Sequence, residues 1–377
     1  MDFQSIKTKC VHAGTLAEVP SQGTNSPIYT STSYSYLDRG EVVYPRYFNI
    51  PNAEAVAAKI AALENTRAGL VLSSGMAAIS STLLAMLKTG DHALFQKGLY
   101  GGTFNMVSRE LERFGISHTI VSENNPETFE KEIRSGTRLV YIETPSNPLL
   151  SITDIAAIVH IARKHNLISV IDNTFASPVN QNPADLGIDI VLHSATKYLG
   201  GHHDICAGAV AGPSELIERI KHMAVSLGGS LNAQTCYLLE RSMKTLFVRV
   251  EAQNSNAGRL ARWLCEQPGI GKVNYPGLER HPGHETAKKQ MKGFGGMLSF
   301  ELAKADPIQF QKKLKLIRPS VSLGGVDTII CSSVLTSHRH LTAEERKKEG
   351  ITEQLLRLSV GIEDVNDLME DLGQALG

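Results

Sequence analysis

The sequence predicts an α/β protein with a mostly parallel central sheet and a smaller α+β C-terminal domain. From residue 67 to about residue 192, short β-branched runs alternate with segments of helical length, which is typical of parallel strands joined by crossover helices. After about residue 213 the pattern becomes helical, and two alternating, strand-like runs follow near the C-terminus. Parallel sheets bind ligands just beyond the carboxyl ends of their strands, so we expect the functional residues there.

The composition favours a small-molecule partner over nucleic acid or a membrane. Of the 377 residues, 42% are hydrophobic and 20% are charged, and 38 basic residues balance 38 acidic ones. No uninterrupted apolar run approaches the roughly 18 residues of a membrane span. Five scattered cysteines lack the CxxC spacing that would suggest a zinc site or a disulfide framework. We therefore expect a cytoplasmic protein.

The sequence predicts that the chain has three parts. Residues 1–52 are rich in Ser, Thr, Tyr, Gly and Pro without a helical period, which predicts an arm that lies on a neighbouring subunit. Residues 53–245 carry the strand-and-helix pattern of a large domain, and residues 246–377 form the C-terminal domain. Asn52 is the expected N-cap of the first helix, at 53–64.

The elements of the large domain follow in order, and each strand leads into a polar segment. Strands are expected at 70–72, 92–95, 139–142, 168–171 and 188–192, and the helices after the first two reach about residues 88 and 114. Further helices are expected at 215–223 and 234–263, strands at 295–302 and 356–360, and a terminal helix from residue 363. The polar segments should converge on one crevice, because parallel strands end at the same edge.

Lys197 is the most informative residue in these segments. It follows a buried strand and has small and apolar neighbours, which would desolvate the ammonium and favour the free amine. A free amine can attack a carbonyl and hold a Schiff base. The alternative is a solvated loop lysine, and the residues around it argue against that.

Those other residues match the parts that pyridoxal phosphate needs. Ser74-Gly75-Met76 starts a helix, where backbone N–H groups bind anions, and Ser194 and Thr196 add hydroxyls. Asp172 ends a neighbouring strand and could pair with a protonated pyridine nitrogen, although an Asp at a turn often only caps a helix. Tyr100, in a glycine loop, could stack on the cofactor ring, although simple packing is the commoner role.

Arg357 interrupts an apolar strand pattern. Leu356, Leu358 and Val360 share one face, so Arg357 projects from the other, where a buried arginine needs an anion. A solvated strand arginine is the alternative.

Seven motifs in order carry a resemblance to a known family. The chain resembles, over nearly its full length, the cystathionine and methionine-metabolism family of pyridoxal-phosphate enzymes, which have the aspartate-aminotransferase-like fold (fold type I). The motifs are Ser73-Ser74-Gly75-Met76-Ala77-Ala78, Tyr100-Gly101-Gly102-Thr103, Glu143-Thr144-Pro145-Ser146-Asn147-Pro148, Asp172-Asn173-Thr174, Ser194-Ala195-Thr196-Lys197, Ser322-Leu323-Gly324-Gly325 and Arg357-Leu358-Ser359-Val360-Gly361.

The resemblance implies a role for each motif. Lys197 would be the Schiff-base lysine, Asp172 the pyridinium partner, and Tyr100 the stacked ring and an acid–base helper. Gly75, Met76, Ser194 and Thr196 would hold the phosphate. The substrate carboxylate would be held by three further residues, Asn147, Ser322 and Arg357.

The arm also has a counterpart in the family. Tyr44-Pro45-Arg46 matches a Tyr-x-Arg that relatives send into the neighbour's phosphate site, which implies a catalytic dimer and a homotetramer of two such dimers. One extra residue after Arg46 departs from the family pattern. His202-His203-Asp204 invites a metal interpretation, but adjacent histidines lack helical i, i+4 spacing, and we expect no metal.

The substrate is harder to predict. Relatives that act on cystathionine commonly carry acidic residues where this chain has Val43 and Val321, and two valines suit an uncharged tail. We therefore expect α,γ-elimination from L-methionine or homocysteine. Methionine lyases usually have cysteine at the position of Gly102, so a cystathionine β- or γ-lyase, or a cystathionine γ-synthase using an acylated homoserine, stays open. A remote alternative is a Rossmann-type dehydrogenase or binding protein, although no Gly-x-Gly-x-x-Gly follows the first strand.

Overall fold

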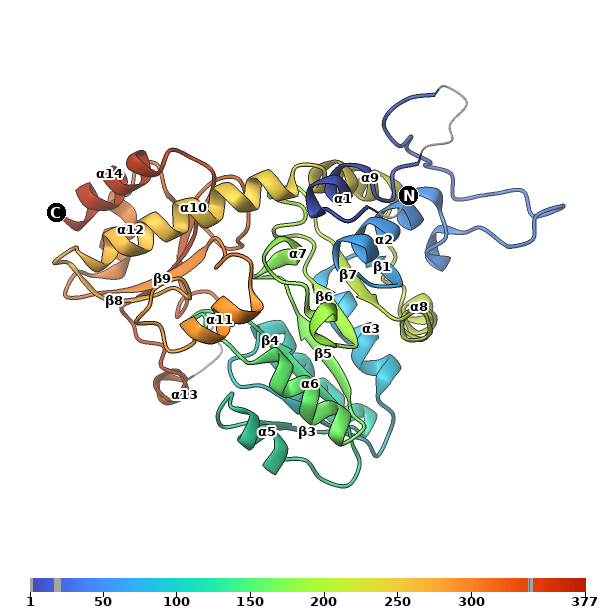
Figure 1. The fold of residues 1–377 in the computed structure, drawn as a ribbon, viewed down its shortest axis with the longest axis horizontal. Coiled ribbons are helices and arrows are strands. Elements are labelled where there is room, and N and C mark those ends of the chain that lie inside the picture. The colour runs from blue at the N-terminus through green and yellow to red at the C-terminus, as the bar shows by residue number, and fades with distance from the viewer. Residues whose placement is uncertain (1–2, 17–21, 338, 340–341) are drawn as a thin grey trace.

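The computed structural model describes residues 3–16, 22–337, 339 and 342–377. Its two sheets lie at opposite ends of the long helix α10 (Leu246–Cys265), with the C-terminal one on the left of Figure 1. The mostly parallel central sheet and the smaller C-terminal sheet confirm the predicted α/β fold class.

The larger sheet has seven strands in the order β1-β7-β6-β5-β4-β2-β3. Every neighbouring pair is parallel except the two that involve β7, which runs antiparallel to both β1 and β6. In sequence the strands are β1 (Ala68–Leu72), β2 (His92–Phe95), β3 (Ser117–Ile120), β4 (Thr137–Glu143), β5 (Ile168–Asp172), β6 (Ile190–His193) and β7 (Gly208–Gly212).

Helices cover both faces of this sheet (Figure 1), which explains the continuous apolar runs of its strands. On β4, Leu139 and Tyr141 belong to one buried cluster, and Val140 and Ile142 to the other. The helices are α2 (Pro51–Leu63), α3 (Gly75–Met86), α4 (Gly101–Asn105), α5 (Pro126–Lys131), α6 (Ile155–Lys164), α7 (Ser177–Asn180), α8 (Ser214–Leu227) and α9 (Ala233–Met243), with short π- or 3₁₀-helical turns at Met106–Glu110, Leu111–Phe114 and Pro183–Leu186.

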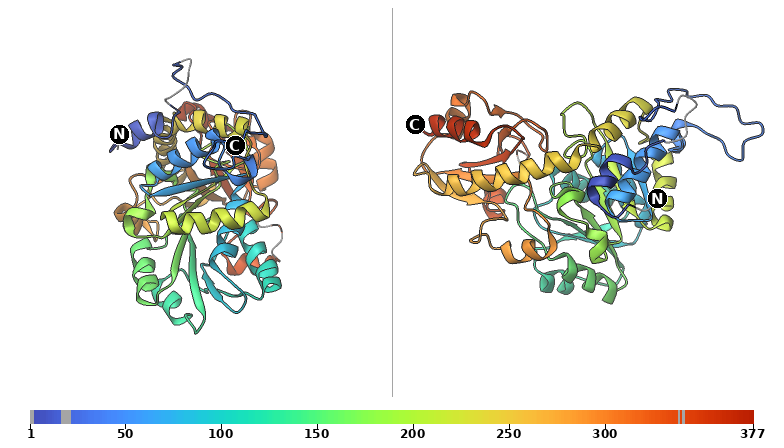
Figure 2. Two further views of the ribbon diagram at one scale, coloured as in Figure 1. Left: turned by 90° about the vertical axis from the view of Figure 1, so that its right-hand side faces the viewer. Right: turned by 45° about the horizontal axis from the view of Figure 1, so that its top comes forward.

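The C-terminal domain carries the five-stranded sheet β10-β11-β12-β9-β8. Figure 2 shows α10 running from this domain back across the molecule. The elements are β8 (Ile270–Asn274), α11 (His284–Gln290), β9 (Met297–Leu302), α12 (Pro307–Lys313), β10 (Arg318–Pro319), β11 (Ile329–Ser332), α13 (Ala343–Lys348), β12 (Leu355–Ser359) and α14 (Val365–Leu376).

The N-terminal arm differs from its prediction in two ways. It contains a helix, α1 (Ile6–His12), and a 3₁₀ turn at Pro45–Tyr47. Asn52 does not cap α2, because Ile50 is the N-cap and Pro51 the first helical residue. The Asn52 side chain instead accepts from Tyr29 N at 2.8 Å and donates to Pro27 O at 2.8 Å, which fastens the arm to the body. Beyond that point the arm projects away from the molecule (Figures 1 and 2).

The long helix expected at 234–263 is two helices, α9 and α10, broken at Lys244 and Thr245. Arg249 spans the break, because its guanidinium donates to Ser242 O and Tyr198 O, each at 2.9 Å. Arg249 therefore ties the helix junction to the segment that follows Lys197. Within the described ranges, no helix is both long and apolar enough to cross a membrane.

Candidate active site

A cavity of about 600 Å³ opens at the carboxyl ends of β4, β5 and β6. It is lined by every residue that the sequence analysis assigns to the site except Tyr44 and Arg46. Residues of the C-terminal domain, among them Ser322 and Arg357, close it from the other side. The strand-end segments therefore converge on one crevice, and the cavity needs both domains.

Lys197 lies in the turn that follows β6. Its backbone N–H donates to Ser194 O at 3.1 Å, and its Nζ donates to Ser322 Oγ at 2.8 Å. Burial, and next to it the charge of Arg357, lowers the pKa of the Lys197 amine. Lys197 therefore loses its proton, and becomes the free amine, at lower pH than an exposed lysine does.

The N-terminus of α3 forms a pocket for an anion. Ser74 caps the helix by accepting from Ala77 N at 3.0 Å, and Gly75 is the first helical residue. A Cβ atom on Gly75 would lie 2.9 Å from Ser194 Cβ, so only glycine lets the helix approach the β6 turn this closely. The backbone N–H groups at the start of α3 and the Ser194 hydroxyl suit a phosphate. The Thr196 hydroxyl lines the same cavity, and it also donates to Ala207 O at 3.2 Å and accepts from Ala207 N at 3.0 Å.

Asp172 ends β5 with its carboxyl partly open to the cavity. Thr174 N donates to its Oδ1 at 2.9 Å. Burial raises the pKa of Asp172, with the Thr174 hydrogen bonds opposing that rise. A cationic ring nitrogen placed here would pair with the carboxylate.

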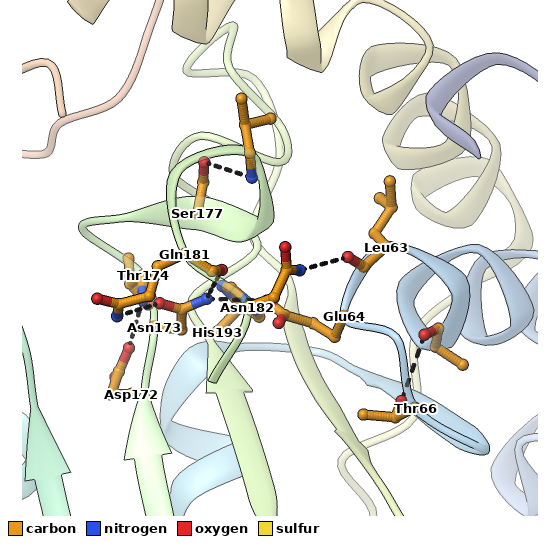
Figure 3. Close-up of polar contacts among 12 residues, drawn as sticks. Leu63, Glu64, Thr66, Asp172, Asn173, Thr174, Ser177, Gln181, Asn182 and His193 are labelled. Atoms are coloured by element: carbon orange, nitrogen blue, oxygen red, sulfur yellow. Dashed lines mark hydrogen bonds and ion pairs between the residues drawn. The ribbon is translucent and has the colours of Figure 1, made fainter. Parts of the chain in front are cut away.

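A buried polar network behind Asp172 fixes the ends of β5 and β6 (Figure 3). The fully buried Glu64, directly after α2, accepts from His193 Nε2 at 2.6 Å and from Asn173 Nδ2 at 2.9 Å. Gln181 in turn donates to Asn173 Oδ1 at 2.9 Å. Because Asn173 and His193 adjoin Asp172 and Ser194, Glu64 holds two cavity-lining segments in register.

Arg357 is 6% exposed and lies on β12. Its Nη1 donates to Asn147 Oδ1 at 3.1 Å and its Nη2 to Ser322 O at 2.7 Å, while its Nε has no partner among the described residues. The expected anion-binding arginine is thus buried, cavity-lining and short of one partner, which suits a carboxylate.

Tyr44 and Arg46 do not line the cavity. Arg46 Nη1 donates to Val225 O on α8 at 2.9 Å, and the Tyr44 side chain is 43% exposed. Neither side chain reaches the cavity of its own chain.

Sequence reasoning missed several residues of the cavity. Glu143 stands in a recognised motif, and its position at a strand end beside Asp172 could have identified it. Leu335 and Arg339 also line the cavity, but they follow β11 in an irregular segment that carries no periodic signal.

The fold and this cavity define a pyridoxal-phosphate-dependent enzyme of fold type I. The side chains present fit the cofactor, since they offer an amine of lowered pKa, an anion pocket that a Cβ would fill, and a carboxylate that faces the cavity. No three His, Cys, Asp or Glu side chains gather as a metal-binding group in the described part of the chain.

The comparisons with known proteins give the family. Residues 7–377 match the model of the Cys/Met metabolism PLP-dependent enzymes, and the chain belongs to this family. It is 42% identical to the cystathionine gamma-lyase of Bacillus subtilis, over 98% of both chains. It is also 42% identical to the L-methionine gamma-lyase of Fusobacterium nucleatum subsp. nucleatum, over 100% of this chain and 99% of that one.

Solved structures agree. The cystathionine gamma-lyase from Lactobacillus plantarum complexed with L-serine matches with a TM-score of 0.94 and 40% identity, over 99% of this chain and 98% of that one. The cofactor is therefore pyridoxal 5'-phosphate, and the alternative of a Rossmann-type dehydrogenase or binding protein is wrong.

The close approach of α3 to Ser194 gives a first prediction. Gly75→Ala should keep the fold but weaken cofactor binding roughly tenfold, about 1.4 kcal/mol, because the new methyl group forces the helix away from Ser194. The dissociation constant for pyridoxal phosphate, measured by titrating apoenzyme, checks this. Gly258→Ala on α10 is the matched control, since its nearest neighbours would lie at 3.8 Å. Equal affinity in both variants would contradict the assignment.

Proposed function

We propose that the protein is a carbon–sulfur lyase that performs α,γ-elimination on L-methionine or L-homocysteine. Water is consumed, and the products are a thiol or hydrogen sulfide, 2-oxobutyrate and ammonia. The observation that carries the substrate choice is the apolar mouth of the cavity. Val321 and Leu335 line it and are 64% and 57% exposed. An uncharged thioether or thiol suits these side chains, whereas a distal ammonium would lack an acidic partner there.

Each cavity residue has a proposed task. When bound, the cofactor supplies the electron sink for negative charge at the substrate α-carbon. Lys197 holds the cofactor and moves the α-proton, which its lowered pKa supports. Asp172 faces the ring nitrogen, and Tyr100 stacks on the ring and assists proton transfer. Gly75, Met76, Ser194 and Thr196 hold the phosphate. Arg357, with Asn147 and Ser322, orients the substrate carboxylate.

We also propose a catalytic dimer, paired into a homotetramer. The arm supports this, because Tyr36, Leu37 and Val42 are each at least 61% exposed on a segment that projects from the body. Exposed apolar side chains of this kind mark contact surfaces. Tyr44 and Arg46, which do not line the cavity of their own chain, would reach the partner's phosphate site. A cytoplasmic location is in keeping with the five free cysteines of the described chain.

A second candidate function is favoured by Arg339. This residue lines the same cavity as Arg357, so two guanidinium groups face the substrate space. Two cations suit a substrate with a second, distal carboxylate, such as an acylated homoserine or cystathionine. A cystathionine lyase or a cystathionine γ-synthase is therefore the runner-up.

Steady-state assays on a substrate panel decide between these functions. Methionine and homocysteine should give the highest kcat/KM, with 2-oxobutyrate and thiol or sulfide released together. Cystathionine and O-succinylhomoserine serve as the charged comparisons. An efficiency on either of these more than about tenfold above methionine and homocysteine would overturn the proposed substrate choice.

Arg357→Lys tests the carboxylate site. Lysine keeps the charge but loses the two-pronged geometry, so kcat/KM should fall about a hundredfold, roughly 3 kcal/mol. The same variant should lose little affinity for the cofactor, which apoenzyme titration measures. Unchanged kcat/KM would mean that another group holds the carboxylate.

Subunit mixing tests the arm. Arg46→Ala should weaken cofactor retention, and Lys197→Ala should abolish turnover. In a mixed dimer one cavity carries both changes and the other carries neither, so at limiting cofactor, where Arg46→Ala has lost most of its activity, mixing the two preparations should restore up to about half of the sites in each mixed dimer. Activity after mixing, with subunit exchange followed by labelled chains, checks this. If exchange occurs and activity stays absent, Arg46 serves its own subunit.

A further inference from the structure

Two acidic residues line the described part of the cavity, Asp172 and Glu143, and the proposed mechanism gives Glu143 no task. Glu143 is the last residue of β4, is paired in register with Asp172 at the end of β5, and is 6% exposed. Both carboxyl groups line the cavity. Gln96 Nε2 donates to the Glu143 carbonyl oxygen at 2.6 Å, so its backbone is fixed as well.

The Glu143 side chain holds the backbone of Tyr100. Tyr100 N donates to Glu143 Oε2 at 2.8 Å, at the residue that caps the short helix α4. The Tyr100 ring packs closely there, since a Cβ on Gly102 would lie 2.6 Å from Tyr100 Cε1 and 2.7 Å from Met76 Sδ. The carboxyl of Glu143 therefore decides where the Tyr100 ring stands in the cavity.

Two buried carboxylates on neighbouring strand ends cannot both carry a charge at low cost. Asp172 has the better surroundings for a charge, because Thr174 donates to it and nearby His193 lowers its pKa. Glu143 has one N–H donor, from Tyr100, and its Oε1 makes no hydrogen bond within the described residues. Burial, and next to it the charge of Asp172, raises the pKa of Glu143 to about 8, and the contacts with Tyr100 N and the hydroxyls of Thr103 and Tyr141 only partly offset that rise.

The remaining polar groups around Glu143 bring no positive charge. They are the hydroxyls of Tyr141, on the same strand, and of Thr103, on α4. The Tyr141 hydroxyl is itself buried, and the side chains of Glu143 and Thr103 are its hydrogen-bonding neighbours. A neutral carboxyl can donate its proton to a hydroxyl and still accept from Tyr100 N.

We propose that Glu143 works as an uncharged carboxylic acid that positions Tyr100, and that it leaves Asp172 as the charged carboxylate of the pair. This inference rests on the proposed function only in giving Tyr100 and Asp172 their tasks. Glu143 is a positioning residue, since it acts through the tyrosine.

Three variants of the full-length enzyme test the proposal. Glu143→Gln stays neutral and keeps both an acceptor and a donor, so its cofactor dissociation constant, its visible absorbance maximum with cofactor bound and its kcat/KM should stay within about twofold of wild type. Glu143→Asp keeps the ionisable group but shortens it, and Glu143→Ala removes it. Both should lose at least tenfold in kcat/KM, on whichever substrate the wild type turns over fastest.

The charge state has its own readout, which needs no substrate. Between pH 4.5 and about 8 the unfolded chain ionises at Glu143 while the folded chain does not, so unfolding is favoured more as pH rises. The Glu143→Gln variant has no ionisable group at this position, so it lacks this contribution to the pH dependence of stability. The Tm of Glu143→Gln apoenzyme should match wild type at pH 5 and exceed it by several degrees at pH 8. Glu251→Gln, an exposed glutamate on α10, is the matched control and should give a difference that does not change with pH.

Each outcome decides. A Glu143→Gln enzyme that loses tenfold or more in kcat/KM would contradict the neutral carboxylic acid. A Tm difference that does not grow with pH would show that Glu143 is ionised in the fold. If Glu143→Ala and Glu143→Asp both keep full activity, the side chain positions nothing. A wrong substrate assignment alters none of these comparisons.

Discussion

Buried charge at the carboxyl edge of the seven-stranded sheet is the constraint on which the rest of the site depends. Glu64, Glu143 and Asp172 all lie there with little access to water, and isolated charges in such a place cost several kcal/mol each. Glu64 is compensated by His193 and Asn173. On the pair of Asp172 and Glu143, one negative charge costs less than two. The hydrogen bond from Thr174 N favours that charge on Asp172, as proposed above. A cationic ring nitrogen beside Asp172 would complete the balance.

Two hydrogen bonds across the cavity tie the two domains together. Lys197 bonds to Ser322 across the cavity, and Arg357 bonds to Asn147, so each domain supplies one partner of each contact. Arg249 on α10 also packs closely against Gly201 in the large domain. A Cβ atom on Gly201 would lie 2.0 Å from Arg249 Nη1. A shift of the C-terminal domain would therefore disturb the surroundings of Lys197 and of Arg357 at once.

Strand ends are the part of the cavity that the sequence predicts best, for a physical reason. A buried parallel strand needs an apolar run, and the residues where that run stops face the ligand edge, so Asp172 and Lys197 are expected at the cavity that they line in the structure. The strand β7 was missed because Gly208–Gly212 consists of small residues without alternation. The prediction that Asn52 caps the first helix is wrong, because its side chain bonds to the distant Tyr29 and Pro27, which no local pattern encodes. The proposed charge sharing between Glu143 and Asp172 depends on strand pairing, which is equally non-local.

The same division explains why the substrate is harder to infer than the chemistry. One wall of the cavity, which we propose holds the cofactor, comes from strand ends and the start of α3, where burial and hydrogen bonding leave little freedom. The opposite wall includes loop residues such as Val321 and Leu335, which are largely exposed and therefore less constrained by packing. Relatives named for cystathionine and for methionine are equally similar to the chain over its whole length. Selectivity between such tails needs only about 1 to 3 kcal/mol, which two or three side chains at the mouth can supply.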